Sequence, residues 1–109
     1  METFAALADP LRASIVAMLA ATEMNVGEIA ARFPVSRPAV SRHLSVLLRA
    51  NLVQVRDQAQ MRLYSLDPQG LDEVERWVDA CRKTWNQRLD ALGRHLDDMA
   101  KKKRKEAKR

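Results

Sequence analysis

Residues 25–52, NVGEIAARFPVSRPAVSRHLSVLLRANL, predict two short helices that meet at a tight corner. Asn25 is placed to cap the first helix, with Glu28 at its third position as in a capping box. A proline ends that helix. Ser36 then caps a second helix that carries Pro38 in its first turn, where the missing N–H costs nothing. This arrangement is typical of a DNA-reading helix-turn-helix.

The second helix of the pair has one apolar face and one polar face. Its inward positions, by spacing, are Val40, Leu44, Leu47 and Leu48. Arginine, serine and alanine remain on or near the outward face, which suits the major groove, where arginine bound to a guanine edge is the commonest specific contact. The candidate DNA-binding residues in and beside this helix are Ser36, Arg37, Pro38, Ala39, Ser41, Arg42, His43 and Ser45.

Each of these candidates also has an interpretation that does not involve DNA. Arg37 and Arg42 could belong to a solvated helix face, and contact with phosphates is as open as contact with bases. The Ser36 hydroxyl has an equally good role as a helix cap. His43 lies beside the apolar face, which favours packing or a phosphate contact over ligation of a metal.

The net charge of +5 is unevenly distributed along the chain. Residues 101–109, KKKRKEAKR, hold seven Lys or Arg against one Glu, so the remaining residues sum to −1. Within that remainder, residues 36–63 carry five arginines against Asp57 alone, a local charge of +4. The basic part of the body therefore coincides with the helix-turn-helix and the segment after it, as expected of a groove-binding module.

A β-hairpin is predicted directly after the helix-turn-helix. Residues 53–57 and 61–66 alternate apolar and polar side chains with a period of two, and the segment between them has no glycine. A hairpin in this position is the wing of a winged helix. Arg56 and Arg62 are its candidates for contact with the adjacent minor groove or backbone, and a solvated hairpin is the alternative.

A long helix follows, over about residues 71–99. Apolar residues recur in it every seven positions, with further apolar residues three or four positions after them, so the sequence predicts a coiled-coil-like seam. The seam is too long for a body of this size to cover, which indicates that a second copy covers part of it. The candidate dimer-interface residues are Phe4, Leu7, Val78, Cys81, Trp85, Leu89, Leu92 and Leu96. Cys81 is interpreted as a small buried hydrophobe, with redox sensing as the alternative.

The predicted fold class is mainly α: a winged helix-turn-helix with a two-stranded β-wing and a long C-terminal dimerisation helix. A short helix and a second helix opened by Asp9 and Pro10 precede the helix-turn-helix. Residues 1–100 are expected to form one DNA-binding and dimerisation domain. Residues 101–109 are expected to be a disordered basic tail, because like charges repel and nothing apolar anchors them.

Several classes of protein do not fit this sequence. No run of about 18 apolar residues could span a bilayer, and no signal pattern opens the chain, so we expect a soluble, cytoplasmic protein with no membrane partner. The single cysteine excludes an intrachain disulfide and argues against a structural zinc site. The sequence also has no Gly-rich phosphate loop and no nucleophile motif, so we expect neither an enzyme nor a cofactor.

The order of these elements and the amino-acid sequence of the motif resemble those of the ArsR/SmtB family of bacterial winged-helix repressors. The resemblance rests on LADPLR at residues 7–12, FPVSRPAVSRHL at residues 33–44 and LLRANLV at residues 47–53. It implies a homodimer joined by the first and last helices, two recognition helices presented to an inverted-repeat operator in double-stranded DNA, and repression that a signal relieves. The resemblance also implies a bacterial protein that is associated with the nucleoid when it is bound to DNA.

The sequence departs from the family at its metal sites. The site before the recognition helix uses a Cys-x-Cys type element in the family, and residues 23–29, EMNVGEI, contain no thiol. The site on the last helix needs spaced histidine and carboxylate ligands, and that helix offers His95 with Asp97 and Asp98. The chain therefore resembles the metal-independent branch, and its small-molecule effector, if it has one, is unknown.

The function predicted from the sequence is a dimeric transcriptional repressor that binds an inverted-repeat operator. Two alternatives belong to other classes. The basic tail and small winged body also suit a sequence-tolerant architectural DNA-binding protein, or a protein-interaction module with the same fold.

Overall fold

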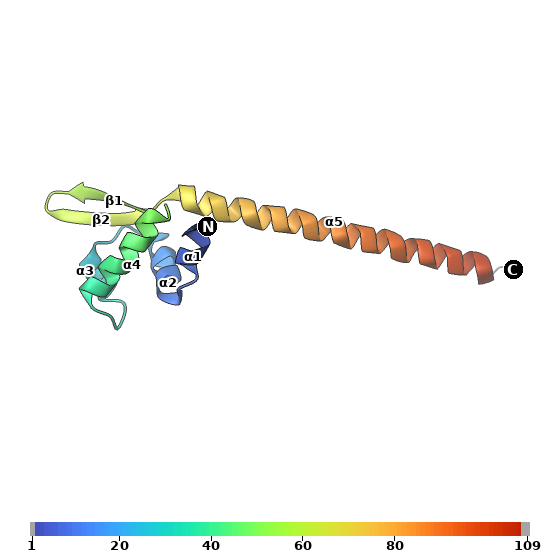
Figure 1. Cartoon of the computed structure of the whole chain (residues 1–109), viewed down its shortest axis with the longest axis horizontal. Helices are drawn as coiled ribbons and strands as arrows, with labels where there is room; N and C mark the ends of the chain where they lie inside the picture. Colours follow the sequence, from blue (N-terminus) through green and yellow to red (C-terminus); the bar gives the residue numbers. More distant parts are fainter. Residues whose placement is uncertain (1, 108–109) are drawn as a thin grey trace. The chain divides into compact units, whose positions relative to one another are not determined.

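The structure is a computed structural model that describes residues 2–107. The chain divides into two compact units, Met1–Glu75 and Arg76–Arg109, and each is described by itself. The elements, labelled in Figure 1, are α1 (Glu2–Leu7), α2 (Pro10–Leu19), α3 (Val26–Ala30), α4 (Arg37–Arg49), β1 (Val53–Gln58), β2 (Met61–Leu66) and α5 (Pro68–Ala107). The mainly helical winged fold predicted from the sequence is confirmed.

Side-chain caps begin the helices where the sequence predicted them. The Asn25 carboxamide oxygen accepts from the Glu28 N–H at 2.8 Å, and the Glu28 carboxylate accepts from the Asn25 N–H at 3.1 Å, which completes the capping box of α3. Ser36 Oγ accepts from the Ala39 N–H at 3.3 Å at the start of α4. At α2 the cap is Asp9, and the hydrogen bonds from the backbone N–H groups of Arg12 and Leu11 lower its pKa.

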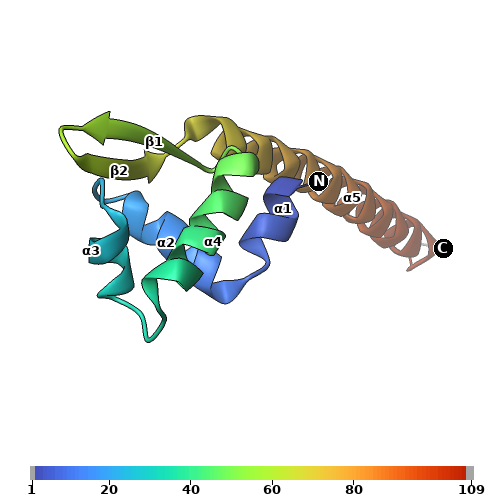
Figure 2. The ribbon, with the colours of Figure 1, turned by 60° about the vertical axis from the view of Figure 1, so that its left-hand side comes forward.

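The core of the first unit forms around α4, which packs against α1, α2, α3 and β1 (Figure 2). The predicted inward residues Val40, Leu44 and Leu47 are fully buried. Ile15 of α2 and Ile29 of α3 meet them in the same cluster and are also fully buried. Burial of several aliphatic side chains, each worth about 1.5–3 kcal/mol, fixes which face of α4 points outward.

The wing is a two-stranded antiparallel hairpin in which Val53 pairs with Leu66 and Gln58 pairs with Met61. A two-residue turn joins the strands, one residue shorter than the connecting segment predicted from the sequence. The base of the wing is attached to the connector before α3, because Met24 and Tyr64 exchange two backbone hydrogen bonds, at 3.0 and 2.9 Å. These bonds limit how far the hairpin can swing from the helix-turn-helix.

The start of α5 is held against the end of α4. Asn51 has a left-handed φ of 58°, as its place at a helix C-terminus predicted, and its carbonyl accepts from the Gly70 N–H at 2.8 Å. A Cβ on Gly70 would lie 2.6 Å from that carbonyl oxygen, so only glycine fits there. Thr3 Oγ1 of α1, which is buried, lies 2.7 Å from a carboxylate oxygen of Glu73.

The second unit is the remainder of α5, and it differs from one expectation. That residues 1–100 form one DNA-binding and dimerisation domain stays a prediction. The helix continues to Ala107, so most of the segment expected to be disordered is helical; Lys108 and Arg109 lie outside the described residues. Lys, Arg, Glu and Ala are strong helix formers, extending an existing helix is cheap, and basic residues in the last turn favour its dipole.

None of the helices within residues 2–107 has a stretch long and apolar enough to cross a membrane.

Ala59 in the turn of the wing has a left-handed φ of 55°, a conformation that costs an L-residue roughly 1–2 kcal/mol. We expect Ala59→Gly to raise the free energy of unfolding by about 0.5–1 kcal/mol in urea titration, less than the full strain because glycine also gains entropy in the unfolded chain. Ala91→Gly, at an exposed helical position, is the control and should lower stability instead. Equal losses in the two variants would contradict the strain at Ala59.

Candidate nucleic-acid interface

The outward face of α4 is exposed along its first three turns. Arg42, Ser41 and Ser45 are exposed, and Arg42 makes no ion pair within residues 2–107. The Ser45 hydroxyl donates to the Ser41 carbonyl at 3.0 Å, which turns that side chain along the helix. The guanidinium of Arg42 is therefore the charged donor on this face that is available to a ligand.

The first turn of α4 has a more specialised geometry. Ser36 Oγ is engaged in the helix cap, Pro38 is exposed and Ala39 is half-buried. The exposed Arg37 side chain folds toward the start of α3, where a Cβ built on Gly27 would lie only 2.9 Å from a terminal guanidinium nitrogen. Gly27 therefore provides the space in which the Arg37 guanidinium lies.

Arg37 and Arg62, 25 residues apart in sequence, line one hollow of about 320 Å³ between the start of α3, the start of α4 and the tip of the wing. The Asn25 carboxamide contacts Met61 Sδ at 3.8 Å across this region. The sequence predicted both arginines as DNA-binding residues, and the structure brings them to the same hollow. Such a pair of cations suits a phosphate group.

The wing arginines are both close to carboxylates, which the sequence analysis did not anticipate. Arg56 forms a bidentate pair with Glu23, with Nε–Oε2 at 2.7 Å and Nη2–Oε1 at 3.1 Å. This pairing lowers the pKa of Glu23 and raises the pKa of Arg56. Arg62 lies 3.7 Å from Asp57, directly across the hairpin. Contact of these arginines with DNA stays a prediction. The charge of Arg56 is already balanced by Glu23 before any DNA binds.

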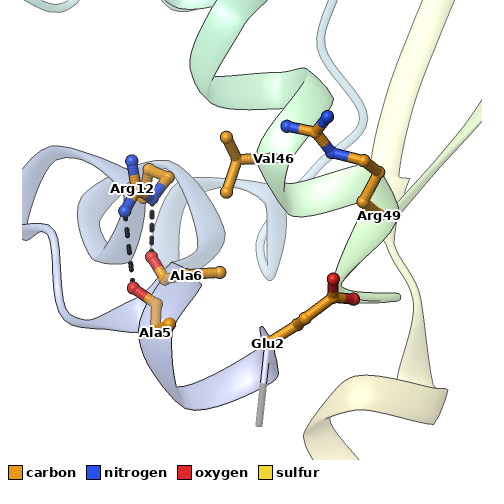
Figure 3. Close-up of a pocket in the computed structure, with 6 residues that line it drawn as sticks. All are labelled: Glu2, Ala5, Ala6, Arg12, Val46 and Arg49. Carbon is orange, nitrogen blue, oxygen red and sulfur yellow. Dashed lines mark hydrogen bonds between the residues drawn. The ribbon is translucent and has the colours of Figure 1, made fainter.

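His43 faces α2 more than solvent, and its partner is a residue that sequence reasoning missed. Its Nδ1 lies 3.3 Å from Nη1 of Arg12, which makes Nδ1 the acceptor of an arginine N–H. Arg12 also donates from Nε to the Ala6 carbonyl at 2.7 Å, and it lines a hollow of about 270 Å³ between α1 and α4 (Figure 3). This contact holds the half-buried His43 ring beside α2, and contact of His43 with DNA stays a prediction.

The candidate dimer-interface residues divide between the units. Phe4 and Leu7 are half-buried in the first unit, where Leu7 packs against the core. In the second unit Val78 is half-buried, whereas the side chains of the other five are exposed, with Trp85 at 56%. The exposed residues are Cys81, Trp85, Leu89, Leu92 and Leu96.

Among residues 2–107, no three His, Cys, Asp or Glu side chains converge on a point where they could hold a metal ion. His95, Asp97 and Asp98 lie exposed on α5.

The helix-turn-helix geometry agrees with comparisons to known proteins. A model of a helix-turn-helix domain matches residues 7–56. The chain is 44% identical over 92 residues to the HTH-type transcriptional regulator Rv2034 of Mycobacterium tuberculosis, a match that covers 84% of this chain and 83% of that protein. The chain belongs to the ArsR/SmtB family of transcriptional regulators.

Further members share its sequence and its fold. The transcriptional repressor SdpR of Bacillus subtilis is 33% identical over 71% of this chain and 86% of that protein. The crystal structure of a possible transcriptional regulator for arsenical resistance is 40% identical, with a TM-score of 0.68 over 73% of this chain and 83% of that one. An ArsR-like transcriptional regulator from Rhodococcus sp. RHA1 is 30% identical, with a TM-score of 0.71 over 84% of this chain and 86% of that one. The chain is thus a DNA-binding transcription regulator of a family whose members are not enzymes.

The close approach of the Arg37 guanidinium to Gly27 can be tested by substitution. Gly27→Ala should displace the guanidinium and weaken DNA binding about fivefold, or roughly 1 kcal/mol, in fluorescence anisotropy titrations. The displaced group is the end of a flexible side chain and alanine is the better helix former in α3, so the free energy of unfolding should not fall. In an Arg37→Ala background the same substitution should have no effect on DNA affinity. An equal loss in both backgrounds would show that Gly27 acts without Arg37.

Proposed function

We propose that this regulator is a homodimeric repressor that binds an inverted-repeat operator and does not sense metals. The observation that carries the proposal is the exposed polar face of α4, opposite a face that is fully buried. Arg42 stands on the exposed face without an ion pair among the described residues, so no salt bridge has to break when it meets a base edge.

The basic residues of the interface have two proposed roles: contact with bases, which reads the sequence, and contact with phosphates, which positions the protein on the DNA. Arg42 lies one turn into α4, where the residues of a recognition helix meet base edges, and we assign it to a guanine. Arg37 and Arg62 line the hollow beside the wing, and we assign them to a backbone phosphate, which fixes register without reading sequence. Arg56, paired with Glu23, holds the wing and adds little net charge.

The dimer follows from the exposed apolar residues of α5. Leu92, Leu96 and Met99 each expose more than half of their surface, which is unusual for a monomer because contiguous exposed apolar surface marks an interaction site. A two-fold dimer presents two copies of α4 to DNA, so its operator is an inverted repeat with half-sites about one helical turn, or a multiple of it, apart. We propose that the regulator lowers transcription because its relative SdpR is named a transcriptional repressor.

Arg42→Ala tests the proposed reader. Once operators have been selected from random double-stranded DNA, this variant should lose about 1–3 kcal/mol of operator affinity and relax preference at one base pair of each half-site. Arg49→Ala, which removes an exposed arginine from the other end of α4, is the matched control and should keep the base preference.

Two results would contradict the assignment. Equal losses on operator and random DNA would make Arg42 a phosphate contact. Failure of the selection to enrich any inverted repeat, with tight binding to all sequences, would favour an architectural DNA-binding protein over a repressor.

Metal independence is tested separately. The chain has one cysteine, and His95 is the only histidine of α5, so neither family site has its ligands. Operator affinity should therefore be unchanged by zinc, cadmium, nickel or a chelator, as measured by titration in each. Tight stoichiometric zinc binding that releases the protein from DNA would overturn this part of the proposal.

A further inference from the structure

Arg12 of α2 is fixed in place by the end of α1. Its Nε donates to the Ala6 carbonyl at 2.7 Å, and its Nη2 donates to the Ala5 carbonyl at 3.4 Å (Figure 3). Both carbonyls belong to the last turn of α1, where a helix has no further N–H groups of its own to offer them. Asp9 Oδ2 lies 3.9 Å from Nη1 of the same guanidinium. These contacts hold the Arg12 side chain in one orientation.

The remaining contact of this guanidinium decides where the proton of His43 lies. Nη1 of Arg12 is 3.3 Å from Nδ1 of His43, which belongs to α4. A guanidinium carries only N–H donors and stays protonated in proteins, so Nδ1 has to be the acceptor. An accepting Nδ1 carries no proton. The proton of the neutral ring is therefore on Nε2, which makes Nε2 a hydrogen-bond donor.

Nε2 of His43 is open to solvent. Among residues 2–107 the ring makes one hydrogen bond, through Nδ1, and every buried nitrogen or oxygen of a half-buried side chain has a hydrogen-bond partner. Because Nε2 has no such partner, it is not buried. The hydrogen-bonding directions of the two ring nitrogens diverge, so Nε2 points away from Arg12. The half-buried ring therefore presents a neutral donor to solvent from α4.

We propose that Arg12 is a positioning residue for DNA binding: it holds His43 in the tautomer whose Nε2–H donates to a backbone phosphate of DNA. The inference rests on the proposed placing of α4 in the groove, and it adds both a contact and the residue that prepares it. His43 lies about 100° around α4 from Arg42, which suits the rim of the groove better than a base edge.

The fixed tautomer matters because of the chemistry of a phosphate. A phosphate oxygen in the DNA backbone only accepts hydrogen bonds. A ring free to change tautomer would present an unprotonated nitrogen to that oxygen part of the time, and two acceptors do not bind each other. Because Arg12 is held by α1 before DNA arrives, the His43 donor is oriented in advance, which lowers the entropy lost on binding.

Two substitutions of His43 separate the roles of its nitrogens. The amide nitrogen of glutamine can take the place of Nε2, whereas the shorter asparagine reaches only the place of Nδ1. His43→Gln should therefore bind DNA as the wild type does. His43→Asn should bind about tenfold more weakly, because each half-site loses one neutral hydrogen bond.

The loss in His43→Asn should be the same on a selected operator and on random double-stranded DNA, because a phosphate contact reads no sequence. Fluorescence anisotropy titration measures both affinities. His95→Asn, at an exposed position of α5, is the matched control and should change neither.

Arg12 is tested through His43. Arg12→Met removes the guanidinium that fixes the tautomer while it keeps an unbranched side chain. The loss of DNA affinity should be about threefold larger in the wild-type background than in the His43→Gln background, where the donor does not depend on a tautomer. A purely structural role of Arg12 would cost the same in both backgrounds and would overturn the inference.

Nitrogen-15 NMR of the imidazole rings reads the tautomer without DNA. At about pH 8, at the upper end of the range in which histidine usually titrates, His43 of the wild type should show a protonated Nε2 and an unprotonated Nδ1. In Arg12→Met the two nitrogen signals should move toward each other, because both tautomers are populated. The chain has two histidines, so His95→Asn assigns the signals. If Arg12→Met does not fold, the wild-type spectrum still decides the tautomer.

The outcomes separate this inference from the proposed function. A proton on Nδ1 of His43 in the wild type would overturn the inference, and so would equal DNA affinities of His43→Gln and His43→Asn. A loss in His43→Asn that is confined to the operator would indicate a base contact and overturn the phosphate assignment. Each of these results leaves the proposed repressor intact. Failure of the proposed function would appear instead in the operator selection and in Arg42→Ala, while the His43 contact remains measurable on random DNA.

Discussion

The structure depends on the complete burial of one face of α4. Val40, Leu44 and Leu47 have no exposed surface, and they hold α4 against the helices before it and the strand after it. Rotating α4 enough to hide Arg42 would expose these three side chains, at a cost of about 1.5–3 kcal/mol for each. The polar face of α4 points to solvent because the apolar face of the same helix has to stay buried in the core. DNA recognition by this regulator is thus a consequence of how its core packs.

The wing is held by a different kind of interaction. Val53 and Tyr64 at its base belong to the core, and its position is set further by the backbone pairing of Met24 with Tyr64 and by the ion pair of Glu23 with Arg56. The ion pair is exposed, so its contribution falls as salt rises, whereas the backbone bonds are not screened. The wing is therefore well attached at its base and less constrained toward its tip, where Arg62 lines the hollow beside α3.

Features set by local interactions were predictable from the sequence, and features set by distant partners were not. The caps at Asn25 and Ser36 and the hairpin of the wing depend on neighbouring residues, and each was confirmed. The alternation of the wing holds in the first part of β1 but not in β2, where Tyr64 is the buried residue. The pairs of Glu23 with Arg56 and Arg12 with His43 join residues 33 and 31 positions apart, and composition and periodicity contain no signal for them. Residues 101–107 are helical where disorder was predicted, because the helix propensity of Lys, Arg, Glu and Ala outweighs the repulsion between their like charges.

These pairings change which charges can act on DNA. The segment from residue 36 to residue 63 has five arginines, but Arg56 is neutralised by Glu23 and Arg62 stands near Asp57. The field at the interface is consequently weaker at the wing than the sequence suggests and is concentrated on α4. Under the proposed function, Arg42 contacts a base and Arg37 contacts a phosphate, so the recognition helix supplies both the discrimination between sequences and the register on the DNA backbone.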